Sequence, residues 1–235
     1  MARENWDPEM LRFTEMMEAR AAAQPPVKLE LPLDNSRELN DGLSLPLAKG
    51  GAVMAESEDR WLALRGRRIL CRFHRPTAGT GHPVLVYLHG GGWTIGDLDT
   101  HDVLCRSLCL QAEVVVVSVD YRMGPEHKFP AAYEDTLAAF YWTVSNAESL
   151  GLDPQRLAIG GDSAGGNLSA AACIGLRDDP EASAQPAYQL LIYPATIMWQ
   201  DTPSFHANGK DYMLTKESIA YYTENYLSSR EDAKD

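Results

Sequence analysis

The stretch Gly161-Asp162-Ser163-Ala164-Gly165 has the pattern G-x-S-x-G and stands between Arg-Leu-Ala-Ile at residues 156–159 and a run of small residues at 164–176. The first run favours a buried strand and the second a helix. A serine at a sharp strand-to-helix turn is forced into a strained conformation, with its hydroxyl above the sheet. Two other interpretations are a turn in which Ser163 caps the helix, and a phosphate loop. A phosphate loop has the pattern G-x-x-x-x-G-K-[ST], and no such lysine follows here.

The small residues around this serine fit the strained turn. A side chain at Gly161 or Gly165 would collide with the adjoining strand or helix. The helix that begins at Ala164 directs its dipole and its free N–H groups toward negative charge that develops beside the turn. The local sequence therefore predicts a nucleophile elbow, the strand-to-helix turn that presents a reactive serine.

A second glycine-rich stretch, His89-Gly90-Gly91-Gly92-Trp93, follows an apolar run at residues 84–88. Consecutive glycines let the backbone approach a substrate closely and turn its N–H groups inward. Together with the N–H of Ala164, these groups would bind a tetrahedral oxyanion, where the loss of one donor typically costs about 3–4 kcal/mol. For His89 the sequence favours a hydrogen bond that shapes the loop over a catalytic role.

Outward from these two stretches, strand and helix patterns alternate, which predicts βαβ crossovers and a mainly parallel sheet. The apolar run at residues 84–88 fits a strand that is buried on both faces, and residues 188–193 fit another buried strand. In such sheets, sites form at the carboxyl ends of the strands. Expected strands are residues 61–65, 67–73, 84–88, 113–119, 156–159 and 188–193, and expected helices are residues 8–23, 99–111, 130–148, 164–176 and 215–227.

Composition excludes several classes of protein. The chain has 235 residues and a net charge of −12, so it lacks the basic surplus that nucleic acids or anionic membranes attract. The first ten residues have no apolar core of a signal peptide, and the longest apolar run, 114–117, cannot span a bilayer. The four cysteines form no CxxC pair and have no histidine at metal-finger spacing, which predicts reduced thiols, no metal site and a cytoplasmic location.

Further motifs in the same order resemble the hormone-sensitive-lipase-like branch of the α/β-hydrolases, the carboxylesterase and acetyl-esterase group. Gly96-Asp97 closes the glycine loop, and residues 191–194 read Leu-Ile-Tyr-Pro. Residues 120–132 read DYRMGPEHKFPAA, close to the family's DYRLAPEHPFPAA. They depart from that pattern at Met123, Gly124 and Lys128. The resemblance covers roughly residues 60–230.

The resemblance implies an α/β-hydrolase fold and a serine carboxylesterase that cleaves short-to-medium acyl esters without a cofactor. It implies that Ser163 is the nucleophile and that Gly91, Gly92 and Ala164 supply the oxyanion N–H groups. The supporting motif residues are His89, Gly90, Gly161, Asp162 and Gly165. Asp120, Arg122, Glu126 and His127 are expected to form a structural polar network beside the elbow.

The predicted organisation has three parts: an N-terminal cap or arm at 1–52, a hydrolase core at 53–199, and a second cap segment with a polar tail at 200–235. Beyond the helix at 8–23, the rest of the first part is expected to be irregular. In that helix Met10, Phe13 and Met17 form an apolar stripe, which favours ordinary helix packing over lining of an acyl pocket.

A catalytic triad on this scaffold needs an acid and then a histidine after the serine. Only His206 follows Ser163, and it lies in a polar loop that does not favour a base. We therefore expect the acid and histidine beyond residue 235, with the last strands missing. The strand at 188–193 would then leave an apolar edge that could pair with a second copy. The alternatives are a non-catalytic binding protein that uses its pocket as the gibberellin receptor does, and an amidase or lactonase.

Overall fold

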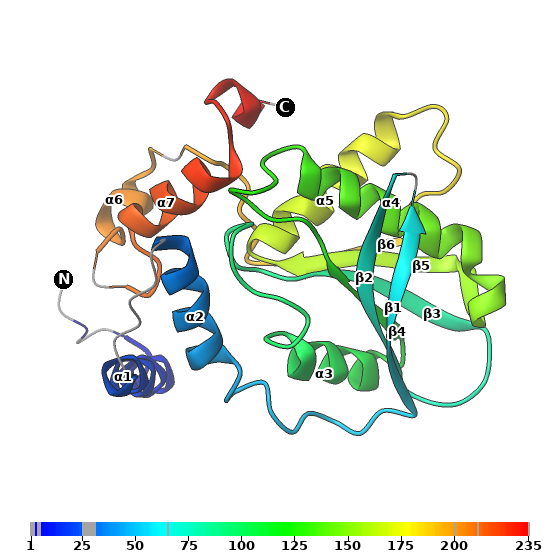
Figure 1. Ribbon diagram of the computed structural model, residues 1–235, viewed down its shortest axis with the longest axis horizontal. Helices are drawn as coiled ribbons and strands as arrows, with labels where there is room; N and C mark the ends of the chain where they lie inside the picture. Colours follow the sequence, from blue (N-terminus) through cyan, green and yellow to red (C-terminus); the bar gives the residue numbers. More distant parts are fainter. Residues whose placement is uncertain are drawn as a thin grey trace.

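The computed structural model describes residues 3, 6–24, 32–64, 66–199, 201–210 and 212–234. Within them, six strands form one sheet in the order β1-β2-β4-β3-β5-β6. Helices flank the sheet, and a group of helices extends from one end of it (Figure 1). None of the helices in the described ranges is long and apolar enough to cross a membrane.

The sheet is mixed, and the predicted parallel part is its larger portion. Strands β4, β3, β5 and β6 are parallel to one another, whereas β1 pairs with β2 and β2 with β4 in antiparallel fashion. The predicted hairpin about Gly66 is present, with longer strands than expected. The strands are β1 (Glu56–Leu64), β2 (Arg67–Arg75), β3 (His82–Leu88), β4 (Val115–Asp120), β5 (Leu152–Asp162) and β6 (Tyr188–Ile192).

The two central strands, β3 and β4, are buried on both faces, as their continuous apolar sequences predict. Val84, Val86 and Leu88 join one core cluster with residues of α4 (Ala131–Asn146) and α5 (Ala164–Asp178). The alternate side chains, Leu85 and Tyr87, belong to a second cluster with cysteines of α3 (Asp102–Ala112). Successive side chains of a strand point to opposite faces, so one helical layer covers each face of the sheet.

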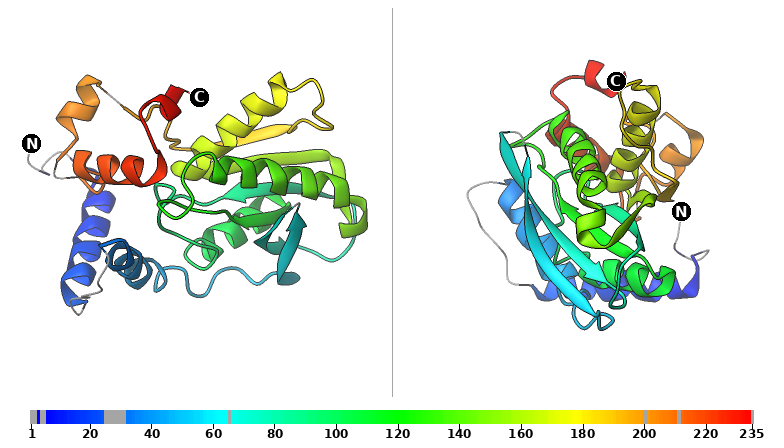
Figure 2. Two further views of the ribbon diagram at one scale, coloured as in Figure 1. Left: turned by 45° about the horizontal axis from the view of Figure 1, so that its top comes forward. Right: turned by 90° about the vertical axis from the view of Figure 1, so that its right-hand side faces the viewer.

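Four helices lie beyond one end of the sheet, and we refer to them as the cap helices (Figures 1 and 2). They come from both ends of the chain: α1 (Pro8–Ala23), α2 (Pro32–Ser44), α6 (Pro203–Ala207) and α7 (Lys216–Tyr226). A ring stack between Trp6 and Tyr212, with centroids 4.8 Å apart, joins the two ends. The cap helices therefore bring sequence-distant segments to the same side of the core.

The expectation of an irregular segment after the first helix is wrong, because α2 occupies Pro32–Ser44. Its sequence is rich in Asp, Asn, Ser and Gly, which are weak helix formers, so its pattern did not indicate a helix. Contacts with other elements stabilise it instead, including a hydrogen bond of 3.4 Å from the Tyr221 hydroxyl on α7 to Ser36. Residues 27–31 of that expectation lie outside the described residues.

The apolar stripe of α1 is not packed as expected, since Met10 is 49% exposed and Phe13 is 36% exposed. The last strand also differs from expectation. As expected, β6 is an edge strand, but it was also expected to be buried, and its residues are all exposed or half-buried. In both segments apolar residues lie where no described element covers them, which hydrophobicity alone cannot predict.

Candidate active site

Ser163 stands at the junction of β5 and α5 in a strained backbone conformation, with φ 52° and ψ −114°. Such a conformation costs a non-glycine residue about 1–3 kcal/mol and persists only where the surroundings enforce it. Here the Ser163 N–H donates to the Ile192 carbonyl at 2.9 Å, and the Ser163 carbonyl accepts from Ala195 N–H at 3.1 Å. Strand β6 and the residues after it thus hold the turn.

The glycines on either side of Ser163 are required by close backbone packing. A Cβ atom built on Gly161 or on Gly165 would overlap the carbonyl oxygen of Leu88, at the end of β3. Even alanine at either position would push β3 and α5 apart. The two glycines therefore bring the serine turn directly against the end of the strand that leads into the second glycine-rich stretch.

The loop after β3 has three consecutive residues with positive φ: Gly91 at 123°, Gly92 at 59° and Trp93 at 56°. We call residues 89–93 the glycine loop. The Gly91 carbonyl accepts from Ile95 N–H at 2.9 Å, and the Gly92 carbonyl accepts from the Thr94 hydroxyl, also at 2.9 Å. With both carbonyls engaged, the peptide orientations of this loop are fixed.

The N–H groups of Gly91, Gly92 and Ala164 donate to no other group in the described part of the chain. Two of these donors belong to the glycine loop, and the third begins α5 directly after Ser163. Unengaged N–H groups on a rigid backbone next to a serine hydroxyl are the elements of an oxyanion hole. Because the loop carbonyls are engaged, these N–H groups could bind a negatively charged oxygen without a backbone rearrangement.

Asp162 joins the serine turn to the glycine loop. Its Oδ1 accepts from Gly90 N–H at 3.0 Å and from the Tyr87 hydroxyl at 2.7 Å, and it lies 3.6 Å from Nε2 of His101. Burial raises the pKa of this carboxyl, but the bonds from His101, Tyr87 and Gly90 outweigh burial and hold it below its ordinary value. The ionised carboxylate is therefore a structural anchor.

His89 is fully buried and shapes the glycine loop. Its Nδ1 lies 2.8 Å from the Gly90 carbonyl oxygen, and its ring stacks on Tyr121 with centroids 4.4 Å apart. The Tyr121 hydroxyl donates to the His89 carbonyl at 2.7 Å. Burial lowers the pKa of His89 to about 4, so its ring is neutral at pH 7.

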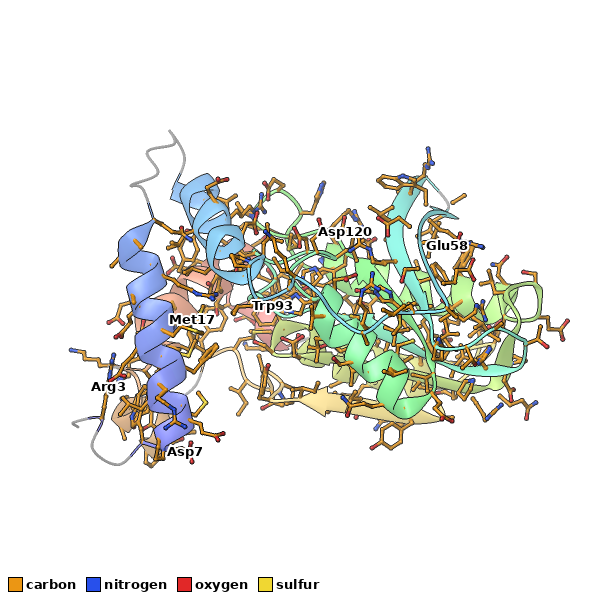
Figure 3. All side chains as sticks on the ribbon, turned by 90° about the horizontal axis from the view of Figure 1, so that it is seen from below. Arg3, Asp7, Met17, Glu58, Trp93 and Asp120 are labelled. Carbon is orange, nitrogen blue, oxygen red and sulfur yellow. The ribbon has the colours of Figure 1, made fainter. Side chains whose placement is uncertain are left out.

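Helix α7 covers the other side of the glycine loop, a contact that the sequence did not reveal. The Tyr222 ring occupies the space that a Cβ on Gly92 would need. The Tyr226 ring stacks on Trp93 with centroids 4.5 Å apart and an interplanar angle of 7°. Figure 3 places Trp93 in the middle of the molecule, between the cap helices and the sheet. In the sequence, the tyrosines at positions 221, 222 and 226 were the feature that could have indicated this contact.

The polar network beside the elbow extends into the cap. Arg122 bonds the buried carboxylate of Asp135 at 2.9 Å, which holds the segment after β4 against α4. Glu126 pairs with Arg37 of α2, and this guanidinium lowers the pKa of Glu126. Asp120 is mostly buried, and burial raises its pKa.

All six histidines of the chain lie in the described residues, and none has a hydrogen bond or ion pair with Ser163. His206 lies on α6, where its Nε2 is 2.5 Å from Asp201, and its side chain is 57% exposed. His101 was not singled out from the sequence, and it contacts Asp162 instead of the serine. The described residues thus contain no assembled serine–histidine pair.

A groove of about 870 Å³ is lined by α5 and by residues of 195–199 and 226–234. Ser163 and the glycine loop are not among its lining residues. We therefore distinguish this groove from the candidate active site.

Comparison with known proteins gives the class. The model of a family with the alpha/beta hydrolase fold matches residues 85–235. This is more than half of the chain, and the chain belongs to that family.

Named relatives are esterases. Carboxylic ester hydrolase LipN of Mycobacterium tuberculosis is 48% identical over 162 residues, which are 68% of this chain and 43% of that protein. Ethyl acetate hydrolase of Pseudomonas putida is 32% identical over 234 residues, 97% of this chain and 73% of that protein. An esterase structure from Pyrobaculum calidifontis matches with a TM-score of 0.86 at 35% identity, covering 97% of this chain and 72% of that one.

The matched part of this chain spans less than half of the first curated relatives, 43% of LipN and 47% of carboxylesterase NlhH.

Proposed function

We propose that this chain carries the nucleophile and the oxyanion hole of a serine carboxylesterase. One observation carries the proposal: Ser163 has a strained backbone beside three unengaged N–H groups, those of Gly91, Gly92 and Ala164. The esterase names of the relatives support it. His89, Gly90, Gly161, Asp162 and Gly165 maintain this geometry through the packing and bonds described above.

In the proposed reaction, the Ser163 hydroxyl attacks the ester carbonyl while its proton passes to a general base. The carbonyl oxygen becomes an oxyanion that accepts hydrogen bonds from the three N–H groups. The tetrahedral intermediate collapses to an acyl-enzyme, and the alcohol leaves with a proton returned by the base. Water then attacks the acyl-enzyme and releases the acid, with Ser163 reprotonated. No cofactor takes part in these steps.

The proposal places the base and its acid partner outside the described residues. None of the six histidines contacts Ser163, and His206 lies exposed on α6. Without a base, a preorganised oxyanion hole retains only a small part of the rate enhancement of a full triad. This chain by itself is therefore expected to hydrolyse esters slowly.

The substrate class proposed is short-to-medium acyl esters. A relative named for ethyl acetate hydrolysis matches along 97% of this chain, which favours small esters. We propose that residues 1–52 and 200–235 are cap segments over a core at 53–199. Contacts of α7 with the glycine loop support this division.

The test uses hydrolysis of p-nitrophenyl acetate and p-nitrophenyl butyrate. Protein that also carries the residues encoded after Asp235 is compared with the 235-residue chain and with Ser163→Ala in both. The proposal expects a large gain in kcat/KM from the added residues and loss of that gain in S163A. No gain, or no Asp and His encoded there, would contradict it.

A second candidate is amide hydrolysis on the same site, because arylacetamide deacetylase of Bos taurus is 38% identical over 155 residues. Turnover of p-nitroacetanilide at a kcat/KM above that of p-nitrophenyl acetate would favour the amide. Lower turnover by several orders of magnitude would exclude it.

We also propose that β6 pairs with a second copy of the chain. It is an edge strand with Tyr188 68% exposed and Leu191 37% exposed, and unpaired edges favour strand pairing. Light scattering at high concentration should give a dimer, which proline at Leu191 should dissociate. A monodisperse monomer would contradict this.

All four cysteines are free thiols, which supports the proposed cytoplasmic location. Fractionation of source cells would test this location.

A further inference from the structure

Two departures from the family pattern in residues 120–132 meet the same structural element. The pattern has alanine and proline where this chain has Gly124 and Lys128. In the structure both residues lie against the C-terminal turn of α7. Both departures therefore affect how the C-terminal turn of α7 is held against the core.

Lys128 binds the end of α7 through two hydrogen bonds. Its ammonium donates to the Glu224 carbonyl at 2.7 Å and to the Leu227 carbonyl at 2.8 Å. The last carbonyls of a helix lack intrahelical partners, and a cation there also interacts favourably with the helix dipole. Proline, the family residue at this position, has no side-chain donor and could make neither bond.

Gly124 lets α7 approach the backbone closely. A Cβ on this glycine would overlap the carbonyl oxygen of Asn225, which belongs to the same turn that Lys128 binds. The Phe129 N–H donates to the Tyr226 carbonyl at 2.8 Å, so the contact continues on the other side of Lys128. Residues 124–129 thus form a seat for one end of α7.

The seated helix supports the glycine loop. Tyr222 fills the space beside Gly92, and Tyr226 stacks on Trp93. The Trp93 carbonyl accepts from the Gly124 N–H at 2.8 Å, which ties the seat to the loop directly. A change at the end of α7 is therefore transmitted to the backbone that presents two of the three proposed oxyanion donors.

We propose that Lys128 is a positioning residue that, together with Gly124, seats α7 on the glycine loop and so fixes the oxyanion donors of Gly91 and Gly92. The inference rests on the proposed function for its catalytic consequence. The seating itself does not depend on catalysis and can be measured separately.

Hydrogen exchange of the 235-residue chain tests the seating. The variants are Lys128→Met, which keeps the aliphatic stem, Lys128→Arg, which keeps the donors, and Gly124→Ala. Lys210→Met, at an exposed lysine, is the matched control. Loss of two charge-assisted hydrogen bonds should speed exchange of α7 amides by about tenfold or more in K128M. The amides of Thr94 and Ile95, which donate to the Gly91 carbonyl, should follow, those of β3 and β4 should not, and K128R should restore slow exchange.

Equal exchange of α7 in K128M and the unaltered chain would overturn the seating. Faster exchange of α7 with unchanged exchange of the Thr94 and Ile95 amides would overturn the link to the oxyanion donors. Equal acceleration of β3 and β4 would show a general loss of stability instead, and would also overturn it.

Ester hydrolysis gives the catalytic readout, measured in protein that carries the residues encoded after Asp235. K128M and G124A should lower kcat by about tenfold with KM nearly unchanged, since oxyanion donors act on the transition state. A rise in KM alone would overturn the positioning role. If no protein hydrolyses the ester, the proposed function fails, whereas the exchange result still decides the seating.

Discussion

The serine turn and the cap helices are held in place by different means. At the serine turn, backbone atoms of β3, β5, β6 and α5 meet with no room for a side chain, and Gly165 shows this most clearly. The cap helices touch the core backbone at Gly124, but long side chains such as Arg37 of α2 and Lys128 of the core hold them to it. Close backbone packing makes the serine turn rigid. The cap helices depend more on individual side chains, so single substitutions can loosen them.

The largest effect on stability is expected from the glycines of the serine turn. Gly165→Ala introduces a methyl group against the Leu88 carbonyl, and overpacking of this kind costs about 1–3 kcal/mol. Urea unfolding should show the loss. Gly42→Ala is the control, because its φ is not positive and a Cβ there meets only the end of the flexible Gln24 side chain. A G165A midpoint equal to that of the unaltered chain would show that this backbone contact is not tight.

Next in size is the loss of the carboxylate that joins the two glycine-rich stretches. In Asp162→Asn the amide cannot accept all the bonds that the carboxylate accepts, so about 1–3 kcal/mol should be lost at pH 7. Because the pKa of Asp162 is lowered in the folded state, its contribution is present above the unfolded pKa and falls as pH drops through the folded pKa.

The difference in unfolding free energy between D162N and the unaltered chain should therefore be large at pH 7 and shrink below about pH 4. Denaturant unfolding at a series of pH values measures it. A difference that stays constant down to pH 3 would show that the charge of Asp162 is not what joins the two stretches.

A smaller effect is expected where α2 is fastened. Arg37 donates to the Thr94 carbonyl at 3.0 Å and to the Gly124 carbonyl at 3.2 Å, in addition to its pair with Glu126. Arg37→Ala should therefore speed hydrogen exchange of the α2 amides more than Glu126→Ala does, because exposed ion pairs contribute only about 0–1 kcal/mol. Arg68→Ala, at an exposed arginine, is the control. If R37A and E126A had equal effects, the ion pair alone would account for the attachment of α2 to the core.

The smallest effect should come from the exposed stripe of α1. Phe13→Ser should change the unfolding free energy by less than about 0.5 kcal/mol, as surface substitutions usually do. Chemical unfolding provides the measurement, with Phe140→Leu in the buried core as the contrasting variant. A loss above about 2 kcal/mol in F13S, near the cost of uncovering a large apolar side chain, would mean that this face is covered in solution.

The sequence predicted the core because its signals are local. Uninterrupted apolar runs gave β3 and β4, and the glycine and serine spacing gave the turn into α5. The roles of Tyr222, Lys128 and His101 could not be predicted in this way, since each depends on which distant backbone it meets. The helix at Pro32–Ser44 was missed for the same reason, because its neighbours and not its composition determine it.

A crystal structure of the phosphonylated protein, obtained with an alkyl fluorophosphonate, tests the central claim most directly. The account predicts one adduct, on Ser163 Oγ, with its phosphoryl oxygen within about 2.7–3.1 Å of the N–H nitrogens of Gly91, Gly92 and Ala164. An adduct on another residue, or a phosphoryl oxygen directed away from these three groups, would contradict it.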